Sequence, residues 1–416
     1  MTAPGSGQAA AINGSESAAP AGHVAEPKQA IGPRIDALLQ RACDDALVPG
    51  VVAMAANRDG ILYQGAFGRR AMAHPTPMTL DTVFMLASMT KTVTSVAAMQ
   101  LVEQGVLGLD DPLGGLVPHF AASMVLEGFS GDGTPMMRPA RRPVTLRHLL
   151  THTSGLGHEL WSPGLVRYQN ATGLLPVGSQ RRASLQVPLL FDPGDRWEYS
   201  VGLEWAGLVI EAATGLSLGA YLERNIFAPL GMGDTAFGVI PRHGDRVAAV
   251  HQREADGSLR PINWQIVPGE YEAGGGGLYG TAPDYLVFLQ MLLNGGRHGA
   301  HRILREETVD LMWHNHIGDV AVTTMKTVDP VTSNDFEVYP GMRKRWGLGA
   351  MITPEPGPDG RSAGSQSWGG IANSYFWLDP VKHVGGLLIT QILPFGDPSV
   401  LGLFGAFERG VYGLAE

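Results

Sequence analysis

The first hundred residues show two different spacings of apolar positions. Between residues 31 and 46, apolar side chains recur every three or four residues, which predicts an amphipathic helix. Two short apolar runs follow at 51–56 and 61–67, and the turn between them contains Asp59-Gly60, a pair typical of a β-hairpin. The folded part of the chain is therefore expected to begin with a helix and a hairpin.

A third apolar stretch, residues 82–104, is long and mostly apolar. Asp81 precedes it as a candidate N-cap and Gly105 closes it, so the pattern predicts one long helix. A helix that is apolar on every side is typical of a protein interior. We expect this helix to be central in the fold.

In the remaining chain, the predicted secondary structure changes twice. Residues 110–275 contain Pro-rich loops and helical patterns at 145–150 and 203–213, with few strand-like alternations. Strand patterns return near the C-terminus at 374–378 and 384–391, followed by a helical pattern over 399–412. Strands at both ends with helices between them indicate one sheet-containing domain that is interrupted by a largely helical insertion.

These changes in composition and predicted secondary structure divide the chain into domains. Residues 1–28 are rich in Ala, Gly, Ser and Pro and are predicted to form a flexible tail; 29–110 and 276–416 form an α/β domain, and 111–275 a mostly helical inserted domain. The tail has no apolar run of the length that a signal peptide needs. No run elsewhere approaches the ~18 apolar residues of a membrane span. We therefore expect a cytoplasmic protein without a membrane partner.

Composition excludes several classes of function. The chain has 416 residues, of which 44% are hydrophobic and 17% charged, as is typical of a folded globular protein. Its formal net charge of −9 is opposite to the basic balance of proteins that grip nucleic acid, so no nucleic-acid partner is expected. Cys43 is the single cysteine, which excludes an intramolecular disulfide and a multi-thiolate metal site.

Two serines have neighbours that suggest a nucleophile. Ser217 lies in a formal G-x-S-x-G, but in hydrolases that motif must form a tight turn between a strand and a helix. Here the preceding residues 203–213 have a helical pattern that Gly215 closes, and a second helical pattern starts at Leu218. Ser217 is therefore interpreted as the N-cap of that second helix.

The other candidate is Ser88, which forms S-x-x-K with Lys91 in the central apolar stretch. On a helix, residues three apart share a face, so the hydroxyl and the amine can reach one another. A hydroxyl is a weak nucleophile until an adjacent base takes its proton, and a partly desolvated lysine can serve as that base or support it. An apolar setting for Lys91 favours this function over a solvent-facing pair.

Further segments follow this S-x-x-K in a recognisable order. They are LLTHTSGL at 149–156, FDPG at 191–194 leading into WEYSVG at 197–202, and SWGG at 367–370. With these segments the sequence resembles the serine β-lactamase and penicillin-binding-protein superfamily, in particular the class C-like branch that holds family VIII carboxylesterases. The resemblance runs from about residue 30 to the end. It implies a β-lactamase-like α/β fold, with a central antiparallel sheet flanked by helices and an inserted helical domain.

The resemblance also implies roles for individual residues. Ser88 would attack a substrate carbonyl and form an acyl-enzyme, while Lys91 and Tyr199 share its proton and later serve the second nucleophile. The oxyanion hole would consist of the backbone N–H groups of Ser88 and Ile371. No metal and no organic cofactor are expected, because this chemistry is nucleophilic.

Two departures from the β-lactamase pattern indicate the substrate class. The second motif has Val201 where β-lactamases carry Asn, and valine offers no side-chain hydrogen bond. The third motif, Trp368-Gly369-Gly370, has Trp where β-lactamases carry a Lys that binds a carboxylate. Tryptophan supplies an aromatic wall with one N–H donor. We expect these residues to contact substrate and to favour neutral, apolar acyl esters.

Other chemistry-bearing residues are interpreted as structural. His314 and His316 have no carboxylate partner nearby in the sequence and are expected on the surface or in a loop. His152 is expected to hold a hydrogen-bonded turn. Residues 274–277 are four glycines without the Lys-Ser/Thr of a phosphate-binding loop, and we expect them to let the backbone run close to the site. Thr281 is expected to cap the helix that follows.

The sequence thus predicts a carboxylesterase that acts on small-molecule esters through an acyl-enzyme on Ser88. The alternatives are an acyltransferase on the same scaffold, in which an alcohol or amine replaces water, and a hydrolase of β-lactams or amides. A non-catalytic binding protein is disfavoured because Ser88, Lys91 and Tyr199 are all present. The oligomeric state is not indicated by the sequence.

Overall fold

The helix α1 (Lys28–Asp44) begins the part of the chain that the computed structural model describes, residues 28–415. The predicted tail therefore lies outside the described residues, apart from Lys28. The predicted hairpin is confirmed as β1 (Gly50–Asn57) and β2 (Ile61–Gly68), paired antiparallel.

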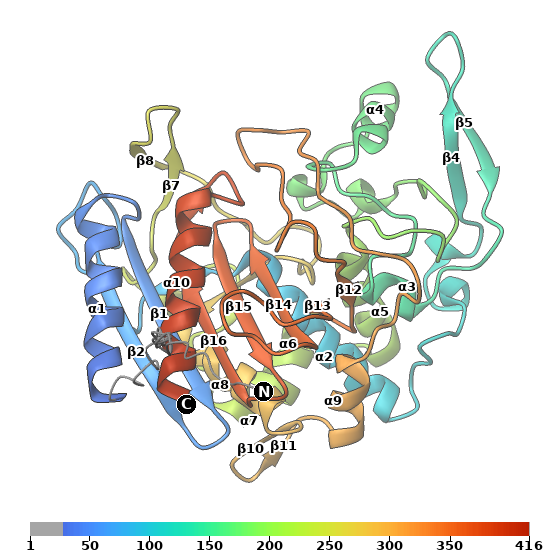
Figure 1. The fold of residues 1–416 in the computed structure, drawn as a ribbon. Coiled ribbons are helices and arrows are strands. Elements are labelled where there is room, and N and C mark those ends of the chain that lie inside the picture. The colour runs from blue at the N-terminus through green and yellow to red at the C-terminus, as the bar shows by residue number, and fades with distance from the viewer. Residues whose placement is uncertain (1–27, 416) are drawn as a thin grey trace, which may run out of the picture.

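A seven-stranded sheet at the centre of the molecule joins strands from both ends of the chain (Figure 1). Its order is β12-β13-β14-β15-β16-β1-β2, and each neighbouring pair is antiparallel. The C-terminal strands are β12 (Arg345–Trp346), β13 (Met351–Thr353), β14 (Ser365–Gly370), β15 (Ser374–Asp379) and β16 (Val384–Ile389). The predicted antiparallel sheet is confirmed, and β1 pairs with β16 across more than 300 residues of sequence because both strands are buried apolar runs.

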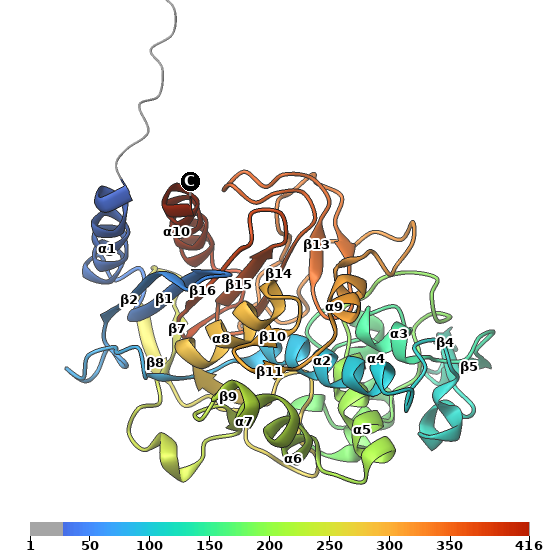
Figure 2. The ribbon, with the colours of Figure 1, turned by 90° about the horizontal axis from the view of Figure 1, so that it is seen from below.

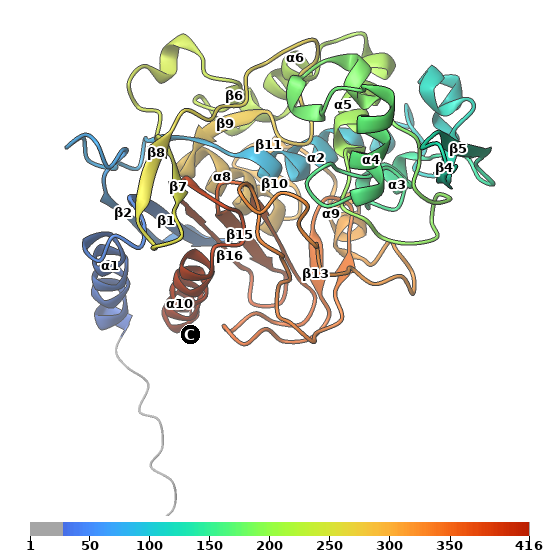
Figure 3. The ribbon, with the colours of Figure 1, turned by 90° about the horizontal axis from the view of Figure 1, so that it is seen from above.

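Helices cover both faces of this sheet. α1 packs against α10 (Pro398–Ala415), and both contact β1 and β2, while α8 (Ala282–Leu293) contacts β1 and β16. Figures 2 and 3 show α1 and α10 together on one side of the sheet, with α8 and α2 (Thr90–Glu103) on the other. Side chains of the sheet and of these helices belong to one continuous hydrophobic core.

The long helix predicted over 82–104 is wrong in its first eight residues. Residues 83–85 form the strand β3 (Val83–Met85), which pairs with β9 (Leu278–Thr281), and a 3₁₀ turn, η1 (Ala87–Met89), precedes α2. Apolar runs of this length cannot be assigned to helix or strand by spacing alone, and the distant partner β9 decides. α2 itself is buried along residues 90–101, as expected for a central helix.

The predicted insertion, residues 111–275, contains short helices and short strands joined by long loops. Its α-helices are α3 (Leu146–Leu150), α4 (Pro163–Thr172), α5 (Gly202–Thr214), α6 (Leu218–Leu222) and α7 (Ala228–Leu230). Its strands are β4 (Met124–Phe129), β5 (Pro135–Pro139), β6 (Ala236–Phe237), β7 (Val250–Arg253) and β8 (Leu259–Ile262). The hairpin β7–β8 pairs with β17 (Ile392–Leu393) and so lies beside the C-terminal part of the fold.

The remaining elements are α9 (Glu306–Trp313) and the short hairpin of β10 (Arg297–His298) and β11 (His301–Arg302). Within residues 28–415, no single helix is long and apolar enough to cross a membrane. The pair Gly202–Thr214 and Leu218–Leu230, bent by 76°, reaches that length and composition only when taken together.

A buried ion pair ties α10 to the loop before β14. Arg361 donates two hydrogen bonds to Glu408, at 2.6 and 2.7 Å, and the two side chains are 2% and 0% exposed.

Glu408→Gln is expected to lower the free energy of unfolding by about 3–5 kcal/mol, because it leaves the Arg361 charge buried without a counter-charge. Urea denaturation measures this. The control Lys326→Ala breaks an exposed pair with Asp335 and is expected to cost less than about 1 kcal/mol. A similar loss in both variants would contradict the prediction.

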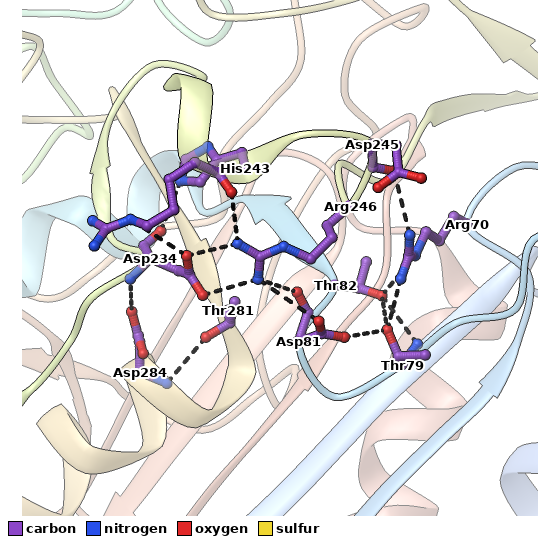
Figure 4. Close-up of polar contacts among 11 residues, drawn as sticks. Arg70, Thr79, Asp81, Thr82, Asp234, His243, Asp245, Arg246, Thr281 and Asp284 are labelled. Atoms are coloured by element: carbon purple, nitrogen blue, oxygen red, sulfur yellow. Dashed lines mark hydrogen bonds and ion pairs between the residues drawn. The ribbon is translucent and has the colours of Figure 1, made fainter.

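A second polar network joins the turn before β3 to the segment after β6 (Figure 4). Arg246 donates to both carboxylate oxygens of Asp234, at 2.9 and 2.7 Å, and to the backbone carbonyl of Asp81 at 3.0 Å. Asp284 accepts the backbone N–H of Asp234 at 2.9 Å, which links this network to the start of α8. The bidentate contact with Arg246 lowers the pKa of Asp234 below its ordinary 3.8.

This lowered pKa predicts a pH-dependent contribution to stability. A carboxyl whose folded-state pKa lies below its unfolded value stabilises the fold above the unfolded pKa, and this contribution disappears as pH falls through the folded pKa. The difference in unfolding free energy between wild type and Asp234→Asn is therefore expected to be constant above about pH 5 and to shrink below 3.8. Urea titrations at several pH values measure it. A difference that grows on acidification would contradict the assignment.

Candidate active site

Ser88 lies on the 3₁₀ turn η1, directly before α2. Ala87, the residue before it, has φ +46°, a left-handed conformation that is strained for a residue with a side chain. Two backbone hydrogen bonds hold this turn, from Leu86 to Leu278 on β9 at 2.9 Å and from Met89 to Leu86 at 3.1 Å. The strained backbone places the Ser88 hydroxyl at the wall of a cavity instead of inside the core.

Three predicted catalytic side chains meet at the Ser88 hydroxyl. The Tyr199 hydroxyl donates to Ser88 Oγ at 2.8 Å, and Lys91 Nζ donates to the same oxygen at 3.3 Å. Lys91 Nζ also lies 4.8 Å from the centre of the Tyr199 ring. Two groups able to hold a proton thus contact the predicted nucleophile, as acyl transfer would require.

Lys91 lies on α2 and is 4% exposed, and its side chain contacts the run of four glycines at 274–277. It donates to the carbonyl of Gly275 at 2.6 Å, and the Gly275 N–H donates to Glu204 Oε2 at 2.5 Å. A Cβ on Gly275 would lie 2.3 Å from Glu204 Oε1, so a larger residue would displace this carboxylate. Burial raises the pKa of Glu204, and the nearby Lys91 charge opposes that rise. The expectation that the glycines run close to the site is confirmed.

Tyr199 is positioned by aromatic neighbours. The His152 ring packs on it with ring centres 4.6 Å apart, and His152 Nδ1 accepts the backbone N–H of Ser200 at 3.1 Å. Burial holds the pKa of His152 well below its usual range, so its imidazole is neutral. His152 itself has a left-handed backbone conformation, with φ +58°. Its backbone and its ring contacts support the interpretation that it stabilises a turn.

Trp368 lies on β14 behind the Tyr199 ring. Its Nε1–H donates to the Tyr199 hydroxyl oxygen at 3.4 Å, and the two rings are 5.2 Å apart. The Trp368 side chain is 5% exposed and also packs against Trp346. In this position the indole contacts Tyr199, the predicted partner of Ser88, and its N–H helps to fix the tyrosine hydroxyl.

Trp368→Phe removes this N–H and keeps most of the ring. We expect kcat for ester turnover to fall about tenfold with little change in KM, because the hydrogen bond that holds the Tyr199 hydroxyl in place is lost. Steady-state kinetics measure both constants, and a thermal melt checks that the fold is intact. An unchanged kcat would show that the N–H contributes nothing to Tyr199.

The predicted oxyanion hole lies where β14 ends against η1. A Cβ on Gly370 would lie 2.5 Å from the carbonyl oxygen of Leu86, so only glycine allows this approach. The next residue, Ile371, lines the same cavity as Ser88. The structure thus brings Ser88 and Ile371 to one wall of the cavity; the role of their N–H groups stays a prediction.

The other predicted substrate-binding residues lie deeper. Val201 is 2% exposed at the start of α5, and its backbone N–H donates to the carbonyl of Gly157 at 3.2 Å. Gly369 is buried within β14, where a Cβ would lie 2.6 Å from the Tyr375 ring. Their contact with substrate stays a prediction.

A cavity of about 260 Å³ opens at the nucleophile. Apolar side chains form much of its wall, and the larger ones are Leu160, Trp161, Val177, Trp264, Ile266 and Ile371. Its polar and charged residues include Ser88, Lys91, His158, Glu159, Gln180 and Glu204. Burial is the main cause that lowers the pKa of His158.

A second cavity, of about 670 Å³, shares the wall residue Trp161 with the first. Trp161 lines both cavities, and Tyr199 lines the second. Its walls come from β4, the first residues of α4 and the loop 320–326. Ser88 thus lines one cavity and Tyr199 the other.

The residues interpreted as structural lie as expected. Ser217 caps α6, where its Oγ accepts the backbone N–H of Ala220 at 3.2 Å, and Gly215 closes α5 with φ +73°. Thr281 caps α8. The His314 ring contacts the carbonyl of Asp310 on its own helix.

Sequence reasoning missed most of the lining of the Ser88 cavity, including His158, Glu159, Trp161 and Glu204. Glu204 had a usable signal, because it is the charged residue in the otherwise apolar stretch 202–210. The other three follow LLTHTSGL directly, and only the path of the loop after 156 shows that they face the nucleophile.

Comparison with known proteins shows the family of the chain. A family model described as Beta-lactamase matches residues 35–403. A monacolin J acid methylbutanoyltransferase of Aspergillus terreus is 34% identical, over 91% of this chain and 95% of that protein. A lovastatin esterase of Penicillium rubens is 31% identical, over 91% and 98%. A solved structure of a simvastatin synthase (LovD) mutant from Aspergillus terreus aligns with a TM-score of 0.80 and 32% identity, over 94% of this chain and 99% of that one.

Proposed function

The chain belongs to the β-lactamase family of serine hydrolases and acyltransferases, and we propose that it is an acyltransferase that moves an acyl group from an ester to an alcohol through Ser88. The observation that carries this proposal is the contact of Ser88 Oγ with both Tyr199 and Lys91, at 2.8 and 3.3 Å.

The reaction takes two steps at Ser88. Lys91 and Tyr199 take the Ser88 proton while Oγ bonds to the donor's carbonyl carbon, and the proton passes to the departing alkoxide. In the second step the acceptor alcohol gives its proton to the same pair, its oxygen bonds to the acyl carbon, and Ser88 Oγ leaves and recovers a proton. N–H groups fixed at Ser88 and Ile371 would stabilise the oxyanion formed in both steps.

The transferase is favoured over the esterase that the sequence predicted. Two observations support this choice: the relative of Aspergillus terreus is a methylbutanoyltransferase, and a second cavity borders Tyr199 beside the one at Ser88. A second cavity lined by Tyr199 would give room for an acceptor beside a donor at Ser88. Hydrolysis is the second candidate, supported by the esterase relative of Penicillium rubens, and differs only in the acceptor.

Product analysis tests the proposal. The protein is incubated with a p-nitrophenyl ester and increasing concentrations of a primary alcohol, and the new ester and the free acid are separated by chromatography. We expect the share of new ester to rise with alcohol concentration and to saturate, since a bound acceptor competes with water. Free acid alone at every alcohol concentration would contradict transfer and leave the esterase. Turnover of a chromogenic cephalosporin is expected to be negligible; rapid turnover would contradict both.

A further inference from the structure

The wall of the Ser88 cavity carries more negative than positive groups. Its charged residues are Lys91, Glu159 and Glu204. Lys91 and Glu204 meet across the Gly275 peptide, whose carbonyl accepts from Lys91 and whose N–H donates to Glu204. Their charges therefore offset one another, and Glu159 is the carboxylate left to face the cavity.

Glu159 has an enclosed oxygen without a hydrogen bond. Within the described part of the chain, nothing donates to its Oε2. The nearest cationic candidate is His158 Nδ1, at 3.9 Å, but this nitrogen accepts the backbone N–H of Leu160 at 3.3 Å and so carries no proton. No group among the described residues thus neutralises the Glu159 carboxylate at close range, and its charge acts on whatever occupies the cavity that it lines.

Two indole rings stand in the same wall as Glu159. Trp161 is nearly buried, and Trp264 is partly exposed on the loop after β8. Aromatic faces attract cations, and tryptophan does so most strongly. Gln180 adds a further carbonyl oxygen, also enclosed and without a hydrogen bond among residues 28–415. Oxygen acceptors and aromatic faces together match a positively charged nitrogen better than a carboxylate.

We propose that the alcohol portion of the substrate carries a quaternary or protonated amine, bound by Glu159, Trp161 and Trp264 in the Ser88 cavity. This proposal rests on the proposed function, because it takes the cavity as the place where the alcohol joins or leaves the acyl group. The amine holds one end of the alcohol while the alcohol oxygen bonds to the acyl carbon and the bond to Ser88 Oγ breaks. The alcohol proton passes to Lys91 and Tyr199.

A pair of thioesters that differ in charge but hardly in shape tests this. Acetylthiocholine carries a trimethylammonium group, and S-(3,3-dimethylbutyl) thioacetate carries a tert-butyl group in its place. We expect kcat/KM, measured by thiol release, to be at least about tenfold higher for the cationic thioester. A ratio of one or less in the wild type would overturn the proposal.

Variants test whether the residues of the Ser88 cavity cause the preference for the cationic thioester. Glu159→Gln is expected to bring the ratio of the two kcat/KM values close to one, and Glu159→Asp to retain a preference. Trp264→Leu is expected to lower the ratio severalfold. The matched control is Glu355→Gln, an exposed carboxylate in the loop after β13, which is expected to leave the ratio as in wild type. An unchanged ratio in both Glu159→Gln and Trp264→Leu would overturn the proposal.

Binding without turnover separates this proposal from the proposed function. If neither thioester acylates Ser88, as read by intact-protein mass spectrometry, the acyl-transfer proposal fails. Calorimetric titration with choline and with 3,3-dimethylbutan-1-ol then still tests whether the cavity binds a cation. Tighter binding of choline that is lost in Glu159→Gln supports a cation site. Equal binding of the two alcohols, or no loss in Glu159→Gln, overturns it.

Discussion

Ser88→Ala is expected to lower kcat for a p-nitrophenyl ester by at least about 10⁴-fold, because no other group can form the acyl-enzyme. In the structure the Ser88 hydroxyl is the atom to which both Lys91 and Tyr199 donate. The loss is measured by steady-state kinetics. Intact-protein mass spectrometry after brief incubation with ester is expected to show one added acyl group in wild type and none in the variant.

The matched control for this experiment is Ser217→Ala, the other serine in a hydrolase-like motif. Ser217 caps α6, so its loss is expected to cost about 1 kcal/mol of stability and to leave kcat within a factor of two or so. Ester turnover that survives in Ser88→Ala, or that disappears in Ser217→Ala without unfolding, would contradict the assignment of the nucleophile.

Tyr199→Phe is expected to lower kcat by about 10²–10⁴-fold. The change removes the hydroxyl that lies 2.8 Å from Ser88 Oγ and keeps the ring that packs on His152 and Trp368. Both acylation and transfer need a proton carrier at this place, so the yield of new ester and of free acid should fall together. Rate measurements with and without an acceptor alcohol test this.

The control here is Tyr221→Phe, because the Tyr221 hydroxyl is buried on α6 away from the Ser88 cavity. Its kcat is expected to match wild type. A Tyr199→Phe variant with wild-type kcat would show that Lys91 alone carries the proton.

Much of the fold could be predicted from local patterns. The hairpin β1–β2, the buried helix α2, the caps at Ser217 and Thr281 and the C-terminal strands all follow from spacing and turn residues that act within a few positions. The strand β3 could not be predicted in the same way. Its three residues are as compatible with a helix, and they are extended because β9 supplies their hydrogen bonds.

The candidate site divides in the same way. Ser88, Lys91 and Tyr199 lie in short motifs whose order along the chain is itself informative, so the sequence was enough to nominate them. Trp368 was nominated as a wall for substrate, whereas the structure places its N–H on the Tyr199 hydroxyl. Glu159 and Glu204 have no motif of their own, and their importance appears only when the cavity they line is seen.

By itself, the sequence determined the family and nominated a nucleophile and the residues able to hold its proton, because these depend on residue identity and short spacings. The tertiary structure alone decided which side chains share a cavity with Ser88, and it showed a second cavity that shares Trp161 with the first. Those facts depend on contacts between α2, α5, β9 and β14, whose residues lie up to about 280 positions apart. Distances of that kind are set by packing and strand register, and no local spacing encodes them.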